Sequence, residues 1–360
     1  MARIDAFFKL MHEQKASDLH LVAGQQPALR IQGEMERVKF KVLDNDELKG
    51  MLYEITPEDK IKTFEETGDV DFAYEIPGLA RYRSNFFQQN FGIGAVFREI
   101  PSEILSVEEL GLPPVVAKLA MLPRGLVLVT GPTGSGKSTS LAAIIDESNE
   151  NRKDHIITIE DPIEFVHKSK SCIVNQREVG MHTKSFASAL RGALREDPDI
   201  ILVGEMRDLQ TISLAIEAAA TGHLVFATLH TTSAAKTVDR MIEVFPAEQQ
   251  AQIRSTLADG IRAVVAQNLL KRIDIPGRIV CPEILIATHA VRALVRENKT
   301  YQIPTAIQTG KKYGMQSLDD AIMTQLKSNR ISADEAYMKC DDKEKFRPFL
   351  RSAPTDFTEV

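Results

Sequence analysis

The sequence has few cysteines, and none of them lies in a pair that a metal or disulfide site would need. The three cysteines, Cys172, Cys281 and Cys340, are far apart in a chain of 360 residues, and no C-x-x-C pair occurs. This spacing supports neither a cysteine zinc site nor a disulfide framework. We therefore expect a protein of the reducing cytoplasm.

Long apolar runs and an excess of positive charge are also absent. No stretch of about eighteen apolar residues occurs, so no membrane-spanning helix is expected. Charged residues interrupt the apolar ones at the N-terminus, which excludes a signal-peptide core, and the spacing of Ile4, Phe7 and Met11 predicts an amphipathic helix instead. The net charge of −6, from 44 basic and 50 acidic residues, argues against a general nucleic-acid binder.

The first part of the chain predicts a small α+β domain over residues 1–98. At this length two domains are expected rather than one. Residues 69–76, DVDFAYEI, alternate apolar and polar side chains as a half-buried strand does, and residues 81–99 predict a hairpin. The proline-containing segment 99–114 is interpreted as a linker, with a helix following at about 115–121.

The second part of the chain predicts a parallel sheet with helices between its strands. Four apolar segments without alternation, LVLVT, IITIE, IILVGE and LVFATLH, are separated by helical patterns. Strands buried on both faces have this pattern. The helix after Asp208 places Leu209, Ile212 and Ile216 on one face. We assign residues 115–287 to this core and 288–360 to a region of short helices.

A phosphate-binding loop follows the first of these strands. Residues 131–138, GPTGSGKS, match the pattern G-x-x-x-x-G-K-[ST] between a strand and a helix. Glycines let successive N–H groups turn toward an anion, Lys137 reaches the β- and γ-phosphates, and the Ser138 hydroxyl ligates Mg²⁺. ATP and Mg²⁺ are therefore expected, with nucleotide contacts from Gly131, Pro132, Thr133, Gly134, Ser135, Gly136, Lys137, Ser138 and Thr139.

Carboxylates stand at the ends of two further strands. Glu205 follows the strand at 200–203, where acidic residues face the ligand crevice of a parallel sheet, and it is the candidate metal ligand or polariser of water. Glu160, Asp161 and Glu164 stand at the end of another strand and would repel one another unless a cation or a proton relieves them. A metal–nucleotide site or salt bridges to Arg or Lys both satisfy this requirement.

Two histidines flank the strand TGHLVFATLHT. If residues 223–230 are extended, the imidazoles of His223 and His230 lie about 23 Å apart at about 3.3 Å per residue, so both cannot contact one phosphate. His230 is at the carboxyl end and is the candidate sensor of the γ-phosphate. His223 is at the opposite end and is expected to be structural or to lie at a subunit contact.

Together these segments resemble the type IV pilus and type II secretion ATPases, and within them the pilus retraction ATPases. The resemblance extends over nearly the whole chain. Five motifs occur in the family's order: ASDLHL (16–21), GPTGSGKST (131–139, Walker A), IITIEDPIEF (156–165, aspartate box), ILVGEMRD (201–208, Walker B) and TGHLVFATLHT (221–231, histidine box).

The resemblance implies a hexameric ring that hydrolyses ATP. Each protomer would have a PAS-like N-terminal domain and a RecA-like P-loop domain, with nucleotide bound between domains and neighbouring subunits. By matched motif Glu205 is the Walker B acid and Glu164 the aspartate-box glutamate, and either one activates water. The motor would act at the cytoplasmic face of the inner membrane, through a pilus platform protein rather than by its own insertion.

The family's arginine fingers match Arg83 and Arg98. If the hairpin turns at Asn90 and Phe91, these arginines are direct cross-strand neighbours, which is destabilising unless an anion such as an ATP phosphate faces them. Arg81 points to the same face of the sheet as Arg83 and is an additional candidate for an arginine finger. A second pair, Arg195 and Arg207, flanks the Walker B strand and competes for this role.

Two features favour retraction over assembly. Assembly ATPases generally carry a longer N-terminal extension and a tetracysteine site, whereas this chain has about a hundred residues before its linker and no cysteine pair. In addition, AVRALVREN at 290–298 resembles a helix of the retraction family, although this chain has Ala293 where the family has an asparagine. The alternatives are an assembly or type II secretion ATPase, and a nucleotide-gated ring that hydrolyses slowly. A nucleic-acid translocase is disfavoured by the net charge.

Overall fold

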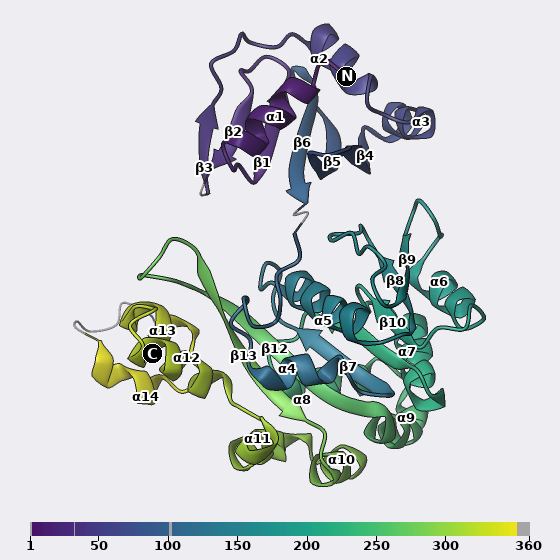
Figure 1. Cartoon of the computed structure of the whole chain (residues 1–360), viewed down its shortest axis with the longest axis vertical. Helices are drawn as coiled ribbons and strands as arrows, with labels where there is room; N and C mark the ends of the chain where they lie inside the picture. The colour runs from purple at the N-terminus through teal and green to yellow at the C-terminus, as the bar shows by residue number, and fades with distance from the viewer. Residues whose placement is uncertain (1, 32, 101–102, 351–360) are drawn as a thin grey trace. The chain divides into compact units, whose positions relative to one another are not determined.

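The chain forms two compact units, Met1–Glu103 and Ile104–Val360 (Figure 1). The structure is a computed structural model and describes residues 2–31, 33–100 and 103–350. The predicted linker at 99–114 includes residues 101–102, and the predicted helical region includes residues 351–360, which lie outside the described residues.

The first unit is a six-stranded antiparallel sheet with three helices. The strand order is β3-β2-β1-β6-β5-β4, and every neighbouring pair is antiparallel. In chain order its elements are α1 (Asp5–Glu13), β1 (Asp18–Val22), β2 (Ala28–Ile31), β3 (Glu34–Arg37), α2 (Asn45–Tyr53), α3 (Glu58–Thr67), β4 (Asp69–Ile76), β5 (Ala80–Gln89) and β6 (Gly92–Ile100).

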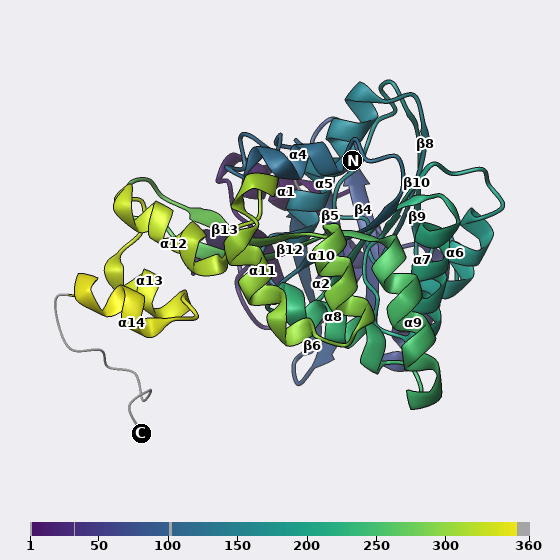
Figure 2. The ribbon, with the colours of Figure 1, turned by 90° about the horizontal axis from the view of Figure 1, so that it is seen from below.

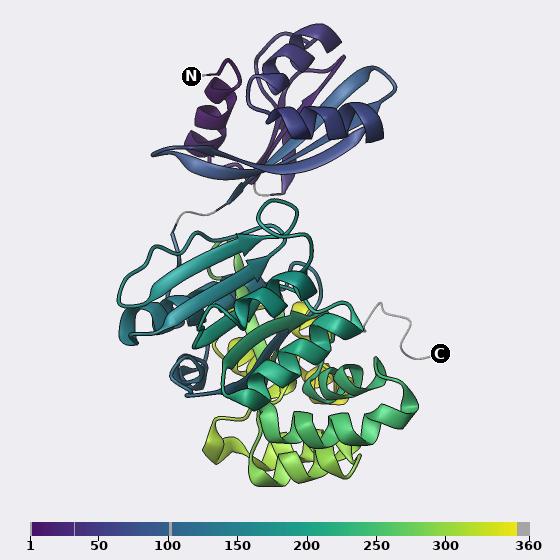
Figure 3. The same cartoon turned by 90° about the vertical axis from the view of Figure 1, so that its right-hand side faces the viewer.

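An aromatic core holds the three helices on one face of this sheet (Figure 3). The alternation predicted for residues 69–76 is confirmed, because Val70 and Phe72 of β4 are buried toward the helices. Phe8 of α1 stacks on Tyr82 of β5 with ring centroids 4.2 Å apart and meets Phe97 of β6 edge-on at 4.9 Å. Such pairs contribute about 0.5–1.5 kcal/mol beyond their burial. The opposite face carries the polar side chains.

The second unit contains a seven-stranded sheet in the order β13-β12-β7-β11-β10-β8-β9, parallel except for the pair β12–β13. The four predicted buried strands are confirmed, and three more are present. The strands are β7 (Gly125–Thr130), β8 (His155–Glu160), β9 (Ile173–Glu178), β10 (Ile200–Val203), β11 (Leu224–Leu229), β12 (Ile261–Lys271) and β13 (Arg278–Ile286).

Helices cover both faces of this sheet, which explains its apolar strands. Leu126 and Leu128 of β7 pack with the helices from α6 to α11, while Val127 and Val129 pack with α4 and α5. The helices are α4 (Pro114–Leu119), α5 (Lys137–Asn151), α6 (Phe186–Ala193), α7 (Leu209–Thr221), α8 (Ala234–Glu243), α9 (Ala247–Gly260), α10 (His289–Arg296) and α11 (Ile303–Thr309).

The first turn of α7 departs from the pattern read in the sequence. Ile212 and Ile216 are buried as predicted, but Leu209 is 40% exposed. Asp208 caps this helix by accepting hydrogen bonds from the backbone N–H and the hydroxyl of Thr211. The cap therefore fixes where the helix begins, and Leu209 lies in the first turn with its side chain partly exposed to solvent.

Short helices end the chain, as predicted. They are α12 (Leu318–Lys327), α13 (Ala333–Lys339) and α14 (Lys343–Phe346), and they lie together beside the β12–β13 pair (Figure 2). Ser317 and Ser332 cap α12 and α13 by accepting from the N–H three residues on. Within the described residues, no helix is both long and apolar enough to cross a membrane.

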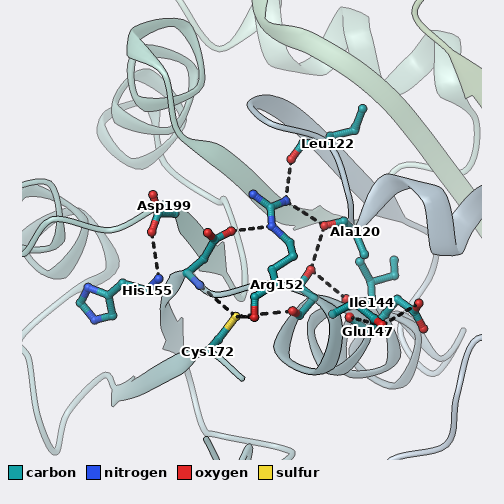
Figure 4. Close-up of polar contacts among 11 residues, drawn as sticks. Ala120, Leu122, Ile144, Glu147, Arg152, His155, Cys172 and Asp199 are labelled. Carbon is teal, nitrogen blue, oxygen red and sulfur yellow. Dashed lines mark hydrogen bonds and ion pairs between the residues drawn. The ribbon is translucent and has the colours of Figure 1, made fainter. Parts of the chain in front are cut away.

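A polar cluster ties the end of helix α5 to helix α4 (Figure 4). Arg152, directly after α5, donates from Nη1 to the carbonyl oxygens of Ala120 at 2.9 Å and Leu122 at 2.6 Å, and from Nε to Asp154 at 2.5 Å. Ser148 of α5 donates its hydroxyl to the same Ala120 carbonyl at 3.0 Å. The helix that begins at the phosphate-binding loop is thus anchored at its far end.

Candidate active site

The loop between β7 and α5 has a backbone that only glycine adopts without strain. Gly131, Gly134 and Gly136 have φ values of +142°, +78° and +85°. A Cβ on Gly131 would lie 2.3 Å from the carbonyl oxygen of Gln267, so this glycine also permits a close approach to β12. The three glycines therefore form a bent loop ahead of a helix N-terminus, a site suited to phosphate.

Gln267 supports this loop, although no sequence pattern pointed to it. Its Nε2 donates to the carbonyl oxygen of Ser135 at 2.7 Å from the neighbouring strand β12, and the side chain is 1% exposed. No motif includes Gln267. Only the pairing of β12 with β7 brings it beneath the loop.

Lys137 is folded back onto the loop. Its Nζ donates to the carbonyl oxygens of Gly131 at 2.9 Å and Pro132 at 3.1 Å. Burial lowers the pKa of Lys137, whereas the charges of Glu205 and Glu164 act in the opposite direction. The ammonium group is therefore close to both predicted carboxylates.

Glu205 and His230 meet at the carboxyl ends of adjacent parallel strands. His230 Nε2 lies 2.6 Å from Glu205 Oε1, and Arg207 donates from Nε to the same oxygen. Partial burial by itself would raise the pKa of Glu205, but the hydrogen bonds from Arg207 and His230 outweigh it and lower the pKa. Glu205 is therefore an anion whose charge is held by two partners.

The three carboxylates at the end of β8 differ in burial. Glu160 accepts from the Thr158 hydroxyl at 2.6 Å and from Gln176 at 3.1 Å, and burial raises its pKa. Its side chain is thus satisfied by neighbouring polar groups, while Asp161 and Glu164 are exposed. Burial thus favours the protonated form of Glu160, which is the alternative to a cation that the sequence left open. No cluster of three His, Cys, Asp or Glu suited to a metal occurs among the described residues.

A cavity of about 510 Å³ lies at this end of the sheet. It brings together Glu205, Arg207 and His230, and it adds Arg240 of α8, which the sequence analysis missed because no motif extends into that helix. The lining residues are Thr133, Glu205, Met206, Arg207, Leu229, His230, Thr231 and Arg240.

Two flanking residues lie away from the cavity. His223 precedes β11, and its Nδ1 lies 3.0 Å from the carbonyl oxygen of Ala218 at the end of α7, so it has a structural contact there. Arg195 is exposed and precedes β10, whereas Glu205 follows that strand. Of the two arginines that flank the Walker B strand, only Arg207 reaches Glu205.

The arginines of the first unit lie in the predicted register. Arg83 of β5 is directly opposite Arg98 of β6, and Arg81 is paired with Glu75. Arg98 Nε donates to Asp18 Oδ1 at 2.8 Å, and Arg83 Nε lies 3.8 Å from Asp71 Oδ1. Acidic side chains of the same unit therefore relieve part of the repulsion between the two arginines, although the contact of Arg83 with Asp71 is long and exposed.

Known proteins resemble the chain along nearly its full length. A model of the family described as type II/IV secretion system protein matches residues 3–302. A type IV pilus retraction ATPase, PilT, of Pseudomonas aeruginosa is 54% identical over 334 residues, which are 93% of this chain and 97% of that protein. A twitching motility protein of Neisseria gonorrhoeae is 51% identical over 318 residues, 88% of this chain and 85% of that protein.

A solved structure gives the same result for the fold. The crystal structure of the pilus retraction motor PilT with bound ADP has a TM-score of 0.90 at 43% identity and covers 97% of this chain and 99% of that chain. This likeness confirms the expected fold class, an α/β chain with a PAS-like α+β domain before a RecA-like P-loop domain and a helical C-terminal region.

Proposed function

The chain belongs to the type II/IV secretion system protein family, and we propose that it is an ATP-hydrolysing motor that drives the retraction of type IV pili. The observation that carries this proposal is the pairing of a Walker A loop with Glu205 and His230 at one sheet edge, in a chain similar from end to end to a retraction ATPase. Similarity over both units favours retraction over assembly or type II secretion.

Binding begins at the phosphate loop. The backbone N–H groups of residues 133–139 receive the phosphates at the N-terminus of α5, and Lys137 exchanges its two carbonyl acceptors for phosphate oxygens. The Ser138 hydroxyl and the Glu205 carboxylate are hard oxygen ligands, and Mg²⁺ typically takes one or two of these with phosphates and water. The metal, when bound with ATP, neutralises phosphate charge.

Hydrolysis requires a polarised water and further positive charge. Glu205, kept anionic by Arg207 and His230, and Glu164, exposed near Lys137, are the two candidates for orienting water. His230 reports on the γ-phosphate because its imidazole already contacts Glu205. Arg83 and Arg98 of one protomer stabilise the charge on ATP held by the next protomer in a hexameric ring.

The place of work follows from this assignment. We place the ring in the cytoplasm at the inner face of the inner membrane, attached through the platform protein of the pilus. ATP hydrolysis moves one domain of a protomer against the other and thereby withdraws pilin subunits from the pilus base.

Live-cell imaging of labelled pili tests this function. In cells without the protein we expect pili to be present but not to shorten, and the wild-type chain to restore shortening. The Lys137→Ala chain should fail to restore it, because the phosphate-bridging ammonium is lost, while Lys153→Ala, an exposed lysine just after the same helix, should succeed.

Two outcomes would contradict the proposal. Absence of pili in the deleted strain would identify an assembly ATPase instead. If the purified wild-type chain released no phosphate above background, the chain would be a passive nucleotide-gated ring.

A further inference from the structure

Four charged residues form a lateral row across the helix-free face of the first unit. The register pairs Arg30 of β2 with Asp18 of β1, Asp18 with Arg98 of β6, and Arg98 with Arg83 of β5. Directly paired residues of antiparallel strands point to the same face of a sheet. The row therefore has three guanidinium groups and a single carboxylate.

Asp18 is the buried member of this row. Its side chain is 4% exposed, whereas that of Arg98 is 68% exposed. Oδ1 accepts from Arg98 Nε at 2.8 Å, while Oδ2 accepts from the Ser17 hydroxyl at 2.8 Å and lies 3.7 Å from Arg30 Nε. Burying a carboxylate is costly unless it is paired and hydrogen-bonded, so this carboxylate has a fixed place and fixed partners.

The bond between Asp18 and Arg98 leaves most of the guanidinium unused. A guanidinium has five N–H donors in one plane, and Asp18 takes the one on Nε. The four donors on the two Nη atoms are not part of this bond. A partner that only neutralised Arg98 would favour the two-bond arrangement with the Nη edge. Asp18 instead accepts from Nε, the guanidinium nitrogen nearest the aliphatic part of the side chain, and so fixes the plane of the group while the two Nη atoms stay outside this bond.

The remaining charge of the row favours an anion. Asp71, which lies 3.8 Å from Arg83, has a side chain that is 60% exposed, so solvent screens that pair. Asp18 is the buried carboxylate that faces the three arginines of the row. An incoming phosphate would find oriented donors from Arg98 beside the charge of Arg83.

We propose that Asp18 is a positioning residue for ATP hydrolysis, which fixes the guanidinium of Arg98 so that its Nη edge meets a phosphate of the ATP bound by a second copy of this chain. This inference rests on the proposed role of Arg98. Asp18 itself contacts neither ATP nor water, and its effect on turnover passes entirely through Arg98.

A double-mutant cycle on the full-length protein tests this role. Asp18→Asn should lower kcat by about tenfold, since the charge-assisted hydrogen bond that holds Arg98 is weakened to one with a neutral amide oxygen, and leave KM and the affinity for ADP unchanged. Arg98→Ala should lower kcat at least as much. The double variant should match Arg98→Ala alone, because Asp18 has nothing left to position.

Control variants separate positioning from charge and from folding. Asp71→Asn, which removes the exposed acid near Arg83, should change kcat by less than about twofold. Arg98→Lys keeps the charge but loses the planar Nε–H, so its kcat should fall by about tenfold, as in Asp18→Asn. This variant keeps the test valid even if Asp18→Asn does not fold, which thermal melting will show.

Each unfavourable outcome has a distinct meaning. If Arg98→Ala leaves kcat unchanged, the role of Arg98 in the proposed function fails, and the role of Asp18 fails with it. If Arg98→Ala lowers kcat and Asp18→Asn lowers it by the same further factor in the double variant, Asp18 acts independently of Arg98. Asp18 is then structural only, and the role of Arg98 stands. Wild-type kcat in Arg98→Lys would also overturn the positioning role.

Discussion

At the scale of single residues, the active site is a set of charges that satisfy one another before any nucleotide enters. Lys137 rests on two loop carbonyls, and Glu205 is held by Arg207 and His230. Each of these hydrogen bonds must break or rearrange when phosphates and a metal bind. The arrangement suggests that nucleotide binding and rearrangement of these side chains are a single event.

The two candidate carboxylates make separable predictions. Glu205→Gln should retain ADP binding and lower ATP turnover by at least about 100-fold, because it removes both a metal ligand and a candidate base. Steady-state phosphate release with ADP binding as the control measures this. Asp161→Asn, an exposed neighbour at the end of β8, should lose far less. Turnover within a few-fold of wild type in Glu205→Gln would leave Glu164 as the acid that matters.

His167 makes stability depend on pH. Burial lowers its pKa to about 4, whereas the unfolded chain has an ordinary value near 6.5. The unfolded chain therefore binds the proton first as the pH falls, and stability is lost between about pH 6.5 and 4. From pH 7 to pH 5 this residue should reduce the free energy of unfolding by about 2 kcal/mol.

Urea unfolding at the two pH values measures this effect. His167→Gln should remove that part of the pH dependence, and His289→Gln, at an exposed histidine, should not. An unchanged pH dependence in His167→Gln would show that other groups are responsible.

Residue identities in the motifs were predictable, but their partners were not. The pattern at 131–138 identifies Lys137 because the loop is local in sequence. Gln267 and Arg240 enter the site from elements more than a hundred residues further on, and no spacing rule connects them to the loop. For the same reason, Asp18 and Asp71 were not foreseen as partners of Arg98 and Arg83.

At the scale of elements, helix α5 connects the phosphate loop to the rest of the second unit. Its N-terminus begins at Lys137, and its end is tied through Arg152 and Ser148 to the carbonyls that follow α4. The position of the loop thus depends on contacts at the far end of the helix.

Removing this tie should destabilise the protein. Arg152→Ala leaves the carbonyls of Ala120 and Leu122 without this donor and Asp154 without its cation, so the free energy of unfolding should fall by about 3 kcal/mol or more. Arg191→Ala, at an exposed position of α6, should change it by less than about 0.5 kcal/mol. If urea unfolding showed the same small decrease in the free energy of unfolding for both variants, the contacts of Arg152 would not stabilise the protein.

The elements were predictable where their pattern was unambiguous. Alternation revealed β4, and apolar runs between turns revealed β7, β8, β10 and β11. The run at 261–271 fits a buried helix as well as a strand, and it follows α9 without a break, so β12 went unrecognised. The segment at 173–178 carries an exposed Ile173 and four polar side chains at a sheet edge, which concealed β9.

At the scale of the whole molecule, the account depends on an active site shared between protomers. We propose that one protomer supplies the loop with Lys137 and that the next supplies Arg98 held by Asp18. This proposal requires the ring to hydrolyse ATP as an assembly.

Mixing two inactive variants measures this sharing most directly. Lys137→Ala retains the arginines but cannot hold phosphates, while Arg98→Ala retains the loop but lacks the neighbouring charge. Each alone should release little phosphate. When the two are mixed and allowed to exchange subunits, phosphate release should rise well above that of either variant, because some interfaces pair an intact loop with an intact arginine. A mixture of assembled rings with confirmed subunit exchange that is no more active than the two variants alone would contradict the shared site.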